Sequence, residues 1–257
     1  MRLAVFSDLH GNLAAFEAAL ADLQALGGAD QTWVLGDLSA FGSRPAECIR
    51  RVQSLKDAEG FGKLHVIGGN TDRYLVNGVR YRSPSAKDAD ELKKLVQTLK
   101  ERDLILNWNL EQLSFEDYDF LKKIRSKEIA EFVEDYGWVI GFHGIPGDDE
   151  RFIWPDTPDN EVLDTLLDRE GRLGICGHTH KPMDRDLGQW RVVNVGSVGL
   201  SFETPGYASW GYFVFENGEV SVDLRSVPYD LEAAIADLEV VGYPLVEWAA
   251  SRLRPKG

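Results

Sequence analysis

Residues 2–20 read RLAVFSDLHGNLAAFEAAL. The apolar run at 2–7 is typical of a buried strand, and residues 12–26 carry apolar side chains at helical spacing. The same order then continues, with a predicted strand at 31–36, a helix at 45–55 and a strand at 63–68. Because strands alternate with helices, we expect a parallel sheet with crossover helices.

The middle of the chain has a different pattern. Residues 85–125 are predicted to form two helices, the second opened by Ser114 with Asp117 three residues later, which is a capping pattern. Further strands are predicted at 127–134, 138–143, 172–176, 190–196, 209–216 and 219–227, and further helices near 158–169, 229–241 and 244–253. No repeat or Pro-, Gly- or Ser-rich linker interrupts this order. The sequence therefore predicts one α/β domain over 1–257 with a helical insertion near 85–125.

Composition excludes several classes of function. The net charge of −14 disfavours nucleic-acid coating and membrane-surface binding, because an acidic surface repels phosphate backbones and anionic lipid. The apolar stretch at the N-terminus is shorter than a signal peptide needs, and no run approaches the ~20 apolar residues of a membrane span. Cys48 and Cys176 match neither a metal knuckle nor a redox pair, so we expect reduced thiols in a cytoplasmic protein. The oligomeric state is not predicted.

Polar residues follow the ends of five predicted strands. In α/β sheets, ligands collect beyond the carboxyl ends of the strands. The residues at these ends are Asp8, His10 and Asn12, then Asp37, then Asn70 and Asp72, then His143, and finally His178 and His180. The remaining histidine, His65, lies inside a strand pattern, where a place in the core or wall is expected.

Each of these residues taken alone could be a helix cap or a turn former. Five strand ends of the same polarity predict a shared metal site instead. Mixed carboxylate, imidazole and amide ligands suit Mn²⁺ best, with Fe, Zn²⁺ or Ni²⁺ as alternatives. The ligands outnumber the needs of one ion and predict two divalent ions about 3.5–4 Å apart, bridged by a carboxylate. Such a pair supplies the positive charge that an acidic protein needs to bind a small phosphorylated substrate.

The motifs Asp8-X-His10, Gly36-Asp37, Gly69-Asn70, His143 and Gly177-His178-Thr179-His180 resemble, in order and spacing, those of the calcineurin-like metallophosphoesterase superfamily. Four further stretches, SDLHGNLAAFEAAL, LGDLSAFGSRPAEC, VVNVGSVG and SVPYDLEAAI, resemble a bacterial and archaeal branch related to diadenosine tetraphosphatase and small phosphodiesterases. The likeness covers nearly the whole chain. It implies a fold of two stacked mixed β-sheets flanked by helices.

The resemblance also implies roles for individual residues. One ion would be held by Asp8, His10 and His180, the other by Asn70, His143 and His178, with Asp37 bridging them. A metal-bound hydroxide would attack phosphorus in line, and the metals would stabilise the phosphoryl charge. The residues expected to take part in catalysis are Asp37, Asn70, Asp72 and His143.

One position departs from the family pattern. The superfamily usually has a histidine after Gly-Asn, where it is thought to protonate the leaving group, but this chain has Thr71. A hydroxyl is too weak an acid for that role, and a positioned acid is typically worth about 10²–10⁴ in rate. We therefore expect slow attack on substrates with poor leaving groups.

Substrate contacts are expected from four residues near these motifs. Asn12, Arg73 and Ser197 lie beside them, and Arg44 follows Gly36-Asp37 in the loop 38–44. Arginines near a phosphate site commonly bind it bidentately. The sequence thus predicts a dimetal phosphoesterase for phosphodiesters or nucleotide-type substrates. A dinucleoside polyphosphate hydrolase, a protein phosphatase or a non-catalytic interaction scaffold on the same fold stay open as alternatives.

Overall fold

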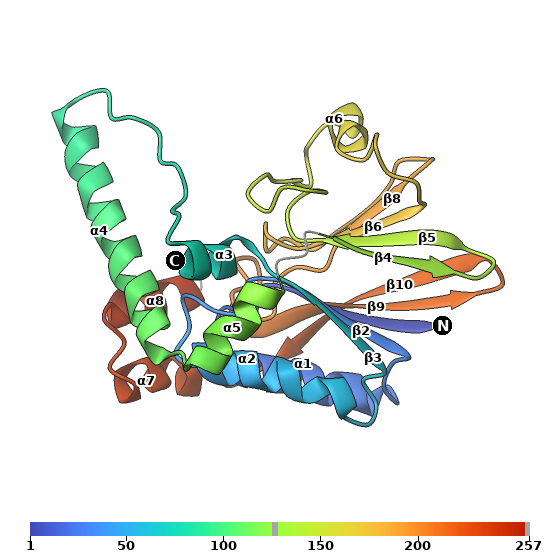
Figure 1. Cartoon of the computed structure of the whole chain (residues 1–257), viewed down its shortest axis with the longest axis horizontal. Coiled ribbons are helices and arrows are strands. Elements are labelled where there is room, and N and C mark those ends of the chain that lie inside the picture. Colours follow the sequence, from blue (N-terminus) through green and yellow to red (C-terminus); the bar gives the residue numbers. More distant parts are fainter. Residues whose placement is uncertain (125–127, 255–257) are drawn as a thin grey trace.

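The computed structural model describes residues 1–124 and 128–254, and its strands form two five-stranded sheets (Figure 1). The strand orders are β10-β9-β1-β2-β3 and β4-β5-β6-β8-β7. Each sheet contains both parallel and antiparallel pairs. The predicted α/β fold of two stacked mixed sheets flanked by helices is confirmed.

The first sheet has a parallel half and an antiparallel half. β1 (Arg2–Phe6), β2 (Gln31–Leu35) and β3 (Lys63–Ile67) run parallel. The hairpin of β9 (Tyr207–Glu216) and β10 (Glu219–Pro228) joins the free side of β1 antiparallel. The carboxyl ends of the three parallel strands therefore lie at one edge of the sheet.

Alternation along β1 explains the layers. Leu3 and Val5 pack into the core between the two sheets, whereas Ala4 and Phe6 pack into the core shared with the helices. Phe6 meets Phe16 edge-on at 5.8 Å between ring centroids. The helices on this face are α1 (Leu13–Ala25) and α2 (Pro45–Ser54), the latter followed by a short 3₁₀ turn, η1 (Leu55–Asp57).

The second sheet consists of β4 (Glu128–Val133), β5 (Gly137–Phe142), β6 (Leu173–Cys176), β7 (Met183–Asp186) and β8 (Arg191–Asn194). One face packs against the first sheet, and the other packs against α6 (Asp159–Asp164) through Val162.

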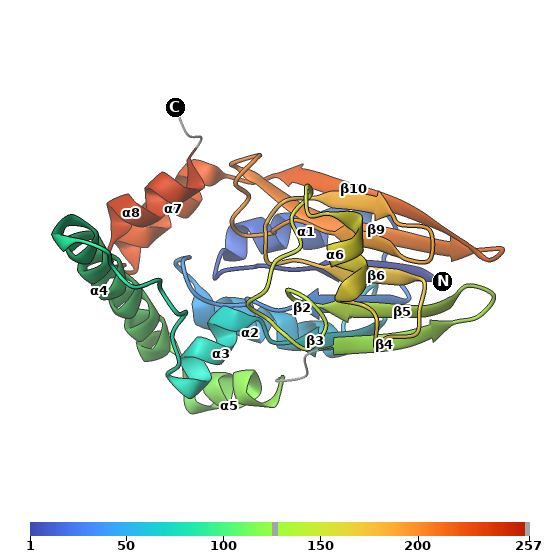
Figure 2. The same cartoon turned by 90° about the horizontal axis from the view of Figure 1, so that it is seen from above.

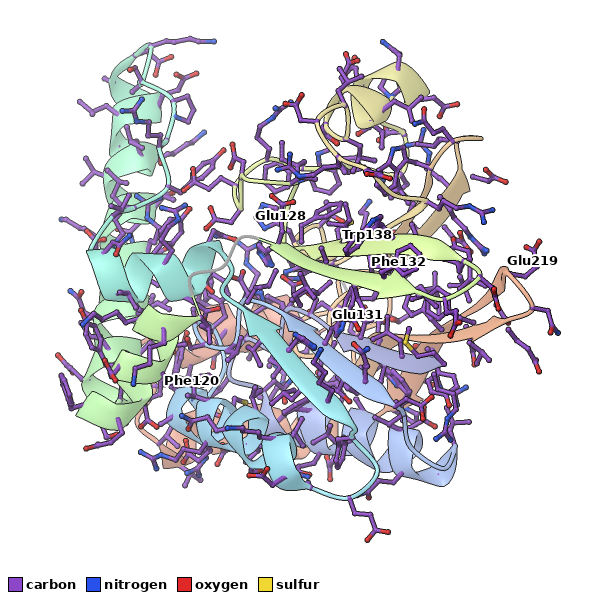
Figure 3. All side chains as sticks on the ribbon, turned by 45° about the vertical axis from the view of Figure 1, so that its right-hand side comes forward. Phe120, Glu128, Glu131, Phe132, Trp138 and Glu219 are labelled. Carbon is purple, nitrogen blue, oxygen red and sulfur yellow. The ribbon has the colours of Figure 1, made fainter. Side chains whose placement is uncertain are left out.

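The β4–β5 hairpin forms one edge of the second sheet (Figure 3). There Phe132 and Trp138 meet edge-on at 5.5 Å between ring centroids, and both are partly exposed. Glu131 of β4 reaches the first sheet, where its carboxylate accepts from Gln31 at 3.0 Å and pairs with Lys63 at 3.6 Å. These polar contacts tie the edges of the two sheets together.

The remaining helices gather at the end of the molecule toward which β1, β2 and β3 run (Figures 1 and 2). They are α3 (Asn70–Asn77), α4 (Ala89–Gln112), α5 (Phe115–Lys123), α7 (Leu231–Val240) and α8 (Val246–Leu253). α4, α7 and α8 share an apolar cluster that includes Ile105, Trp108, Leu238 and Ala249. These helices face the carboxyl ends of β1, β2 and β3, where residues of the predicted site lie.

Most predicted elements are present. The insertion forms α4 and α5, and Ser114 and Asp117 form the expected capping box. The predicted last residue of the insertion, 125, and the predicted first residue of the next strand, 127, lie outside the described residues. Three differences are observed: α3 and β7 were not predicted, and α6 is shorter than the helix expected near 158–169. Among the described helices, none is both long and apolar enough to cross a membrane.

Candidate metal centre

The carboxyl ends of five strands bring the predicted ligands together. Asp8 follows β1, Asp37 follows β2, and Asn70 opens α3 shortly after β3. From the second sheet, His143 directly follows β5, and the loop after β6 contributes both His178 and His180. The two sheets therefore each supply part of one buried centre.

The backbone at the centre is strained. Five of the seven predicted ligands have a positive φ, between 47° and 67°: Asp8, His10, Asp37, His178 and His180. Such conformations cost of order 1–3 kcal/mol each in non-glycine residues and persist only where the surroundings impose them. Here the loops brace one another, since the Asp8 amide donates to the Gly36 carbonyl at 3.0 Å and the His10 amide to the Asp37 carbonyl at 2.9 Å.

Gly69 of the Gly-Asn motif and Gly177 of the Gly-His motif allow close packing of these loops. A Cβ on Gly69 would collide with the carboxylate of Asp37, and one on Gly177 would collide with Ser7 and Asp8. The Gly-Asn and Gly-His pairs are therefore required by the space around the ligands, not only by turn geometry.

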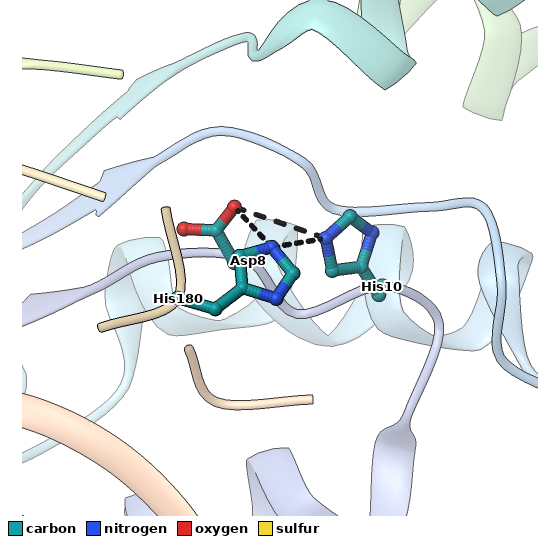
Figure 4. A group of neighbouring side chains, drawn as sticks. All are labelled: Asp8, His10 and His180. Atoms are coloured by element: carbon teal, nitrogen blue, oxygen red, sulfur yellow. Dashed lines mark hydrogen bonds and ion pairs between the residues drawn. The ribbon is translucent and has the colours of Figure 1, made fainter. Parts of the chain in front are cut away.

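The first group of ligands is Asp8, His10 and His180 (Figure 4). Nε2 of His180 lies 3.2 Å from Oδ1 of Asp8 and 3.1 Å from Nε2 of His10. The Nδ1–H of His180 donates to the carbonyl of Leu200 at 2.7 Å, which directs the lone pair of Nε2 into the centre. Oδ2 of Asp8 accepts from the His178 amide, but its Oδ1 is buried without a hydrogen-bond partner.

The second group is Asp37, His143 and His178, joined by Asn70. The Nδ1–H of His143 donates to the Leu35 carbonyl at 2.7 Å, and its Nε2 lies 3.1 Å from Oδ1 of Asn70. Where Nε2 of His143 carries a proton, it donates to the Asn70 carbonyl oxygen. An ion that displaced this proton would find both atoms as ligands.

Asp37 lies between the two groups. Its Oδ1 accepts from the Thr71 amide at 2.8 Å. Its Oδ2 lies 3.7 Å from Nε2 of His10 and 3.5 Å from Nε2 of His143. One oxygen of this carboxylate is thus fixed by the backbone, while the other faces both groups.

The electrostatics of the centre call for positive charge. Asp8 and Asp37 are buried, and within the described ranges neither pairs with a lysine or arginine. Burial opposes ionisation, but the surrounding imidazoles outweigh it and lower the pKa of Asp37 to about 2 and that of Asp8 further. Burial also lowers the pKa of His143, yet the carboxylates of Asp37 and Asp8 raise it overall to about 10.

Divalent cations fit this donor set. Burial lowers the pKa of His10 and His178 to about 4, which leaves both rings neutral and able to ligate. The Oδ1 of Asp8, which is buried without a hydrogen-bond partner, is an acceptor that a cation would satisfy. Imidazole, carboxylate and amide ligands suit divalent transition metals.

A family model described as the calcineurin-like phosphoesterase superfamily domain matches residues 1–216. The chain belongs to this superfamily. An uncharacterised protein of Methanocaldococcus jannaschii is 26% identical over 272 residues, covering 98% of this chain and 96% of its own length. Among solved structures, a metallophosphoesterase from Sphaerobacter thermophilus has 22% identity and a TM-score of 0.71, with 98% of each chain covered. A hypothetical protein from Pyrococcus horikoshii has 20% identity and a TM-score of 0.80, covering 100% of this chain and 98% of its own.

Three of the other predicted site residues, Asn12, Ser197 and Asp72, support the backbone of this calcineurin-like centre. The Asn12 side chain caps α1 by accepting from Ala15 and donates to the Gly199 carbonyl at 2.9 Å. The Ser197 hydroxyl donates to the Asp8 carbonyl at 2.8 Å. Both residues are buried and hold loops that carry ligands.

Asp72 is buried behind the loop that carries Asp37. Its carboxylate accepts from the amides of Leu38, Ser39 and Gly69 at 3.1–3.4 Å. Burial and the charge of Asp37 raise the pKa of Asp72 to about 7. Asp72 borders a cavity of about 210 Å³, which also touches the ligand His143 and is distinct from the larger cavity over most of the other ligands.

The two arginines predicted to bind phosphate are held by carboxylates. Arg44 pairs with Asp237 at 2.6 Å and with Glu47 at 3.2 Å. Both nitrogens of the Arg73 fork bond to Asp149 at 2.8 Å, one of them also to Glu150 at 2.7 Å, and Arg73 borders the same smaller cavity as Asp72. Neither guanidinium borders the larger cavity over most of the ligands.

That cavity has a volume of about 380 Å³. His10, Asp37, Asn70, His178 and His180 form its floor. Aromatic side chains surround the floor and pack on the ligand imidazoles: Phe41 lies 5.0 Å from His10, Phe152 stacks on His178 at 4.4 Å, and Phe202 stacks on His180 at 4.8 Å.

None of these three phenylalanines is predicted from the sequence. Each lies in a loop, and each is partly exposed. The available signal was an aromatic residue in a loop close to a ligand motif, and surface aromatics are too common to be assigned from that alone.

Proposed function

We propose that the protein is a dimetal-dependent phosphoesterase acting on phosphodiester or nucleotide-type substrates. The observation that carries the proposal is Asp37, one of whose oxygens faces both groups of ligands. Asp8, His10 and His180 would hold one ion, Asn70, His143 and His178 the other, with Mn²⁺ as the preferred metal and Fe, Zn²⁺ or Ni²⁺ as alternatives. When bound, such ions lower the pKa of an attacking water and neutralise charge on the phosphoryl oxygens.

The chain's own contribution is to orient its ligands before any ion binds. Carbonyls of Leu35 and Leu200 accept from Nδ1 of His143 and His180. The Glu150 carbonyl, 3.3 Å from Nε2 of His178, leaves that residue's Nδ1 as the ligating atom. Partners of this kind fix the ring orientation and raise ligand basicity, and their loss typically weakens metal binding or activity by about 10–100-fold.

Leaving-group chemistry favours diesters with acidic leaving groups. The Thr71 hydroxyl donates to the Ser39 carbonyl at 3.1 Å, and its amide donates to Asp37. Thr71 therefore shapes the Asp37 loop and offers no general acid to the cavity that it borders. An aryl or similarly acidic leaving group departs from a phosphodiester without that proton.

Two further parts of the proposal concern the chain as a whole. We expect residues 1–257 to act as one domain, because the C-terminal helices α7 and α8 pack on α4 in a shared apolar cluster. We also expect a cytoplasmic location. Cys48 and Cys176 are free and buried, and burial raises the pKa of both thiols.

The test is hydrolysis of bis(p-nitrophenyl) phosphate by protein that has been stripped with chelator and then reloaded with Mn²⁺. We expect turnover that depends on added metal and is lost again on chelation. A protein that binds Mn²⁺ tightly but cleaves neither this diester nor a panel of phosphate esters would instead support the scaffold alternative.

A further inference from the structure

The wall of the cavity comes from segments that carry no metal ligand. α4 of the insertion contributes Arg102 and Leu106, and α8 contributes Trp248 and Arg252. In Figure 2 these two helices lie close to each other at the end of the molecule toward which β1 and β2 run. The cavity therefore has a floor built by strand ends and a wall built by helices.

Two arginines of the wall have no carboxylate partner among the described residues, although Glu150, which pairs with Arg73, also borders the cavity. Arg102 donates to the Tyr81 carbonyl at 2.9 Å, and Arg252 lies over the Trp248 ring at 5.0 Å. Neither guanidinium has a carboxylate within ion-pair distance in the part of the chain that the structure describes. In a protein with a net charge of −14, such arginines beside a cavity suit an anion.

The wall and rim also offer flat aromatic surface. Phe202 has one face on His180 and is still 41% exposed. Trp248 packs at a tilt against Phe41, with 5.9 Å between ring centroids, and borders the cavity. Aromatic side chains of this kind stack on planar rings of a substrate, a contact typically worth a several-fold to roughly hundredfold change in affinity.

We propose that this wall is a substrate subsite, in which Arg102 and Arg252 bind a second anionic group and Phe202 and Trp248 stack on an aromatic ring. The inference rests on the proposed function and narrows its substrate class to aromatic phosphoesters that carry a second negative charge, of the nucleoside diphosphate type. A volume of about 380 Å³ falls within the range of small-molecule sites, roughly 300–1,000 Å³.

The experiment measures binding by calorimetry to Mn²⁺-loaded protein with three phosphonates. Two of them have no ester bond, and the third keeps only an alkyl ester bond to ribose, which a protein without a general acid should cleave slowly. Methylphosphonate has neither feature, phenylphosphonate has the ring, and α,β-methylene adenosine diphosphate has both the ring and a second anionic group. We expect affinity to rise in that order. Because a hydrogen bond from an arginine to a charged group is worth roughly tenfold to a hundredfold, Arg102→Gln and Arg252→Gln should each weaken the diphosphonate by at least about tenfold relative to phenylphosphonate.

Matched controls lie on the same two helices. Lys100→Gln on α4 and Arg254→Gln just after α8 remove the same charge from exposed positions that do not border the cavity. Both variants should leave unchanged the ratio of the affinity for α,β-methylene adenosine diphosphate to the affinity for phenylphosphonate. Trp248→Leu should reduce the preference for phenylphosphonate over methylphosphonate several-fold and leave the effect of the second anion in place.

Two results would overturn the subsite. The first is that the arginine variants weaken the binding of all three phosphonates equally, or no more than the control variants do. That pattern would report only the overall electrostatic field of the protein. The other is wild-type protein that binds the diphosphonate no better than methylphosphonate. Since binding is measured and not turnover, failure of the proposed function appears separately, as intact arginine-dependent binding in a protein that hydrolyses no phosphoester.

Discussion

The floor and the wall of one cavity are built in different ways. The floor residues follow strands, and most have a strained backbone that hydrogen bonds between loops hold in place. The wall residues Arg102, Trp248 and Arg252 project from helices of the insertion and the C-terminus. The floor is thus rigid because the sheets are rigid, whereas the wall depends on how α4 and α8 pack.

Because of this difference, we expect the floor to determine whether a substrate is hydrolysed and the wall to determine which substrate is preferred. Changes in the floor should abolish hydrolysis of every substrate, because all substrates need the same centre. Changes in the wall should alter the choice among substrates.

The largest effect is expected from Asp37→Ala. Without the carboxylate that faces both groups, hydrolysis of bis(p-nitrophenyl) phosphate should fall at least about a thousandfold, since metal-assisted charge stabilisation is worth several kcal/mol. Glu59→Ala, which removes one exposed negative charge, is the control and should leave kcat/KM unchanged. A loss for Asp37→Ala smaller than tenfold would show that the centre does not depend on a shared carboxylate.

The next effect concerns Thr71, at the border between floor and wall. For the natural protein, log kcat should fall steeply as the pKa of the leaving group rises, because no acid protonates the departing oxygen. Thr71→His should speed cleavage of alkyl esters more than aryl esters, by up to about two orders of magnitude. A flat plot for the natural protein, or an equal gain for both classes, would show that another group supplies the proton.

Removal of metal should destabilise the floor more than the wall. Ions present at about 100 times their dissociation constant contribute roughly 2.7 kcal/mol to the free energy of unfolding. At about 2–4 °C per kcal/mol for a chain of this size, chelation should lower Tm by about 5–10 °C. Asp37→Ala should lose most of this response, whereas Arg252→Gln should keep it. An unchanged Tm in wild-type protein would count against bound ions.

The smallest effect is expected from Arg73→Ala, where sequence and structure point in different directions. The sequence predicts a phosphate contact, but the guanidinium is held by Asp149 and Glu150. We expect a loss of roughly 1 kcal/mol in stability, or about 2–4 °C in Tm, with KM changed less than twofold. A raised KM with unchanged Tm would restore the prediction from sequence.

The sequence could place the predicted metal ligands at strand ends because these signals are local. A residue that directly follows a buried apolar run has its position fixed by the strand, and the structure has Asp8, Asp37 and His143 at such ends. α3 was missed because Gly69 to Asp72 has the composition of a turn, yet Asp72 caps the helix as its third residue. β7 was missed because Met183–Asp186 carries two aspartates and no apolar run.

The wall could not be predicted because its signals are tertiary. Arg102 and Arg252 lie on helices that carry several other exposed charged residues, and nothing in their neighbours distinguishes them. Only the packing of α4 against α7 and α8 brings both to one cavity. Conversely, Arg73 is close to Asn70 in sequence, but the loop at Asp149 neutralises its charge, a contact across 76 positions of the chain.

The central claim is a floor that holds two ions, and elemental analysis after Mn²⁺ reconstitution tests it most directly. Wild-type protein, freed of loosely bound metal by gel filtration, should retain close to two divalent ions per chain. Asp37→Ala should retain neither. One ion or none in the wild-type protein would contradict the dimetal centre, whatever the protein is found to hydrolyse.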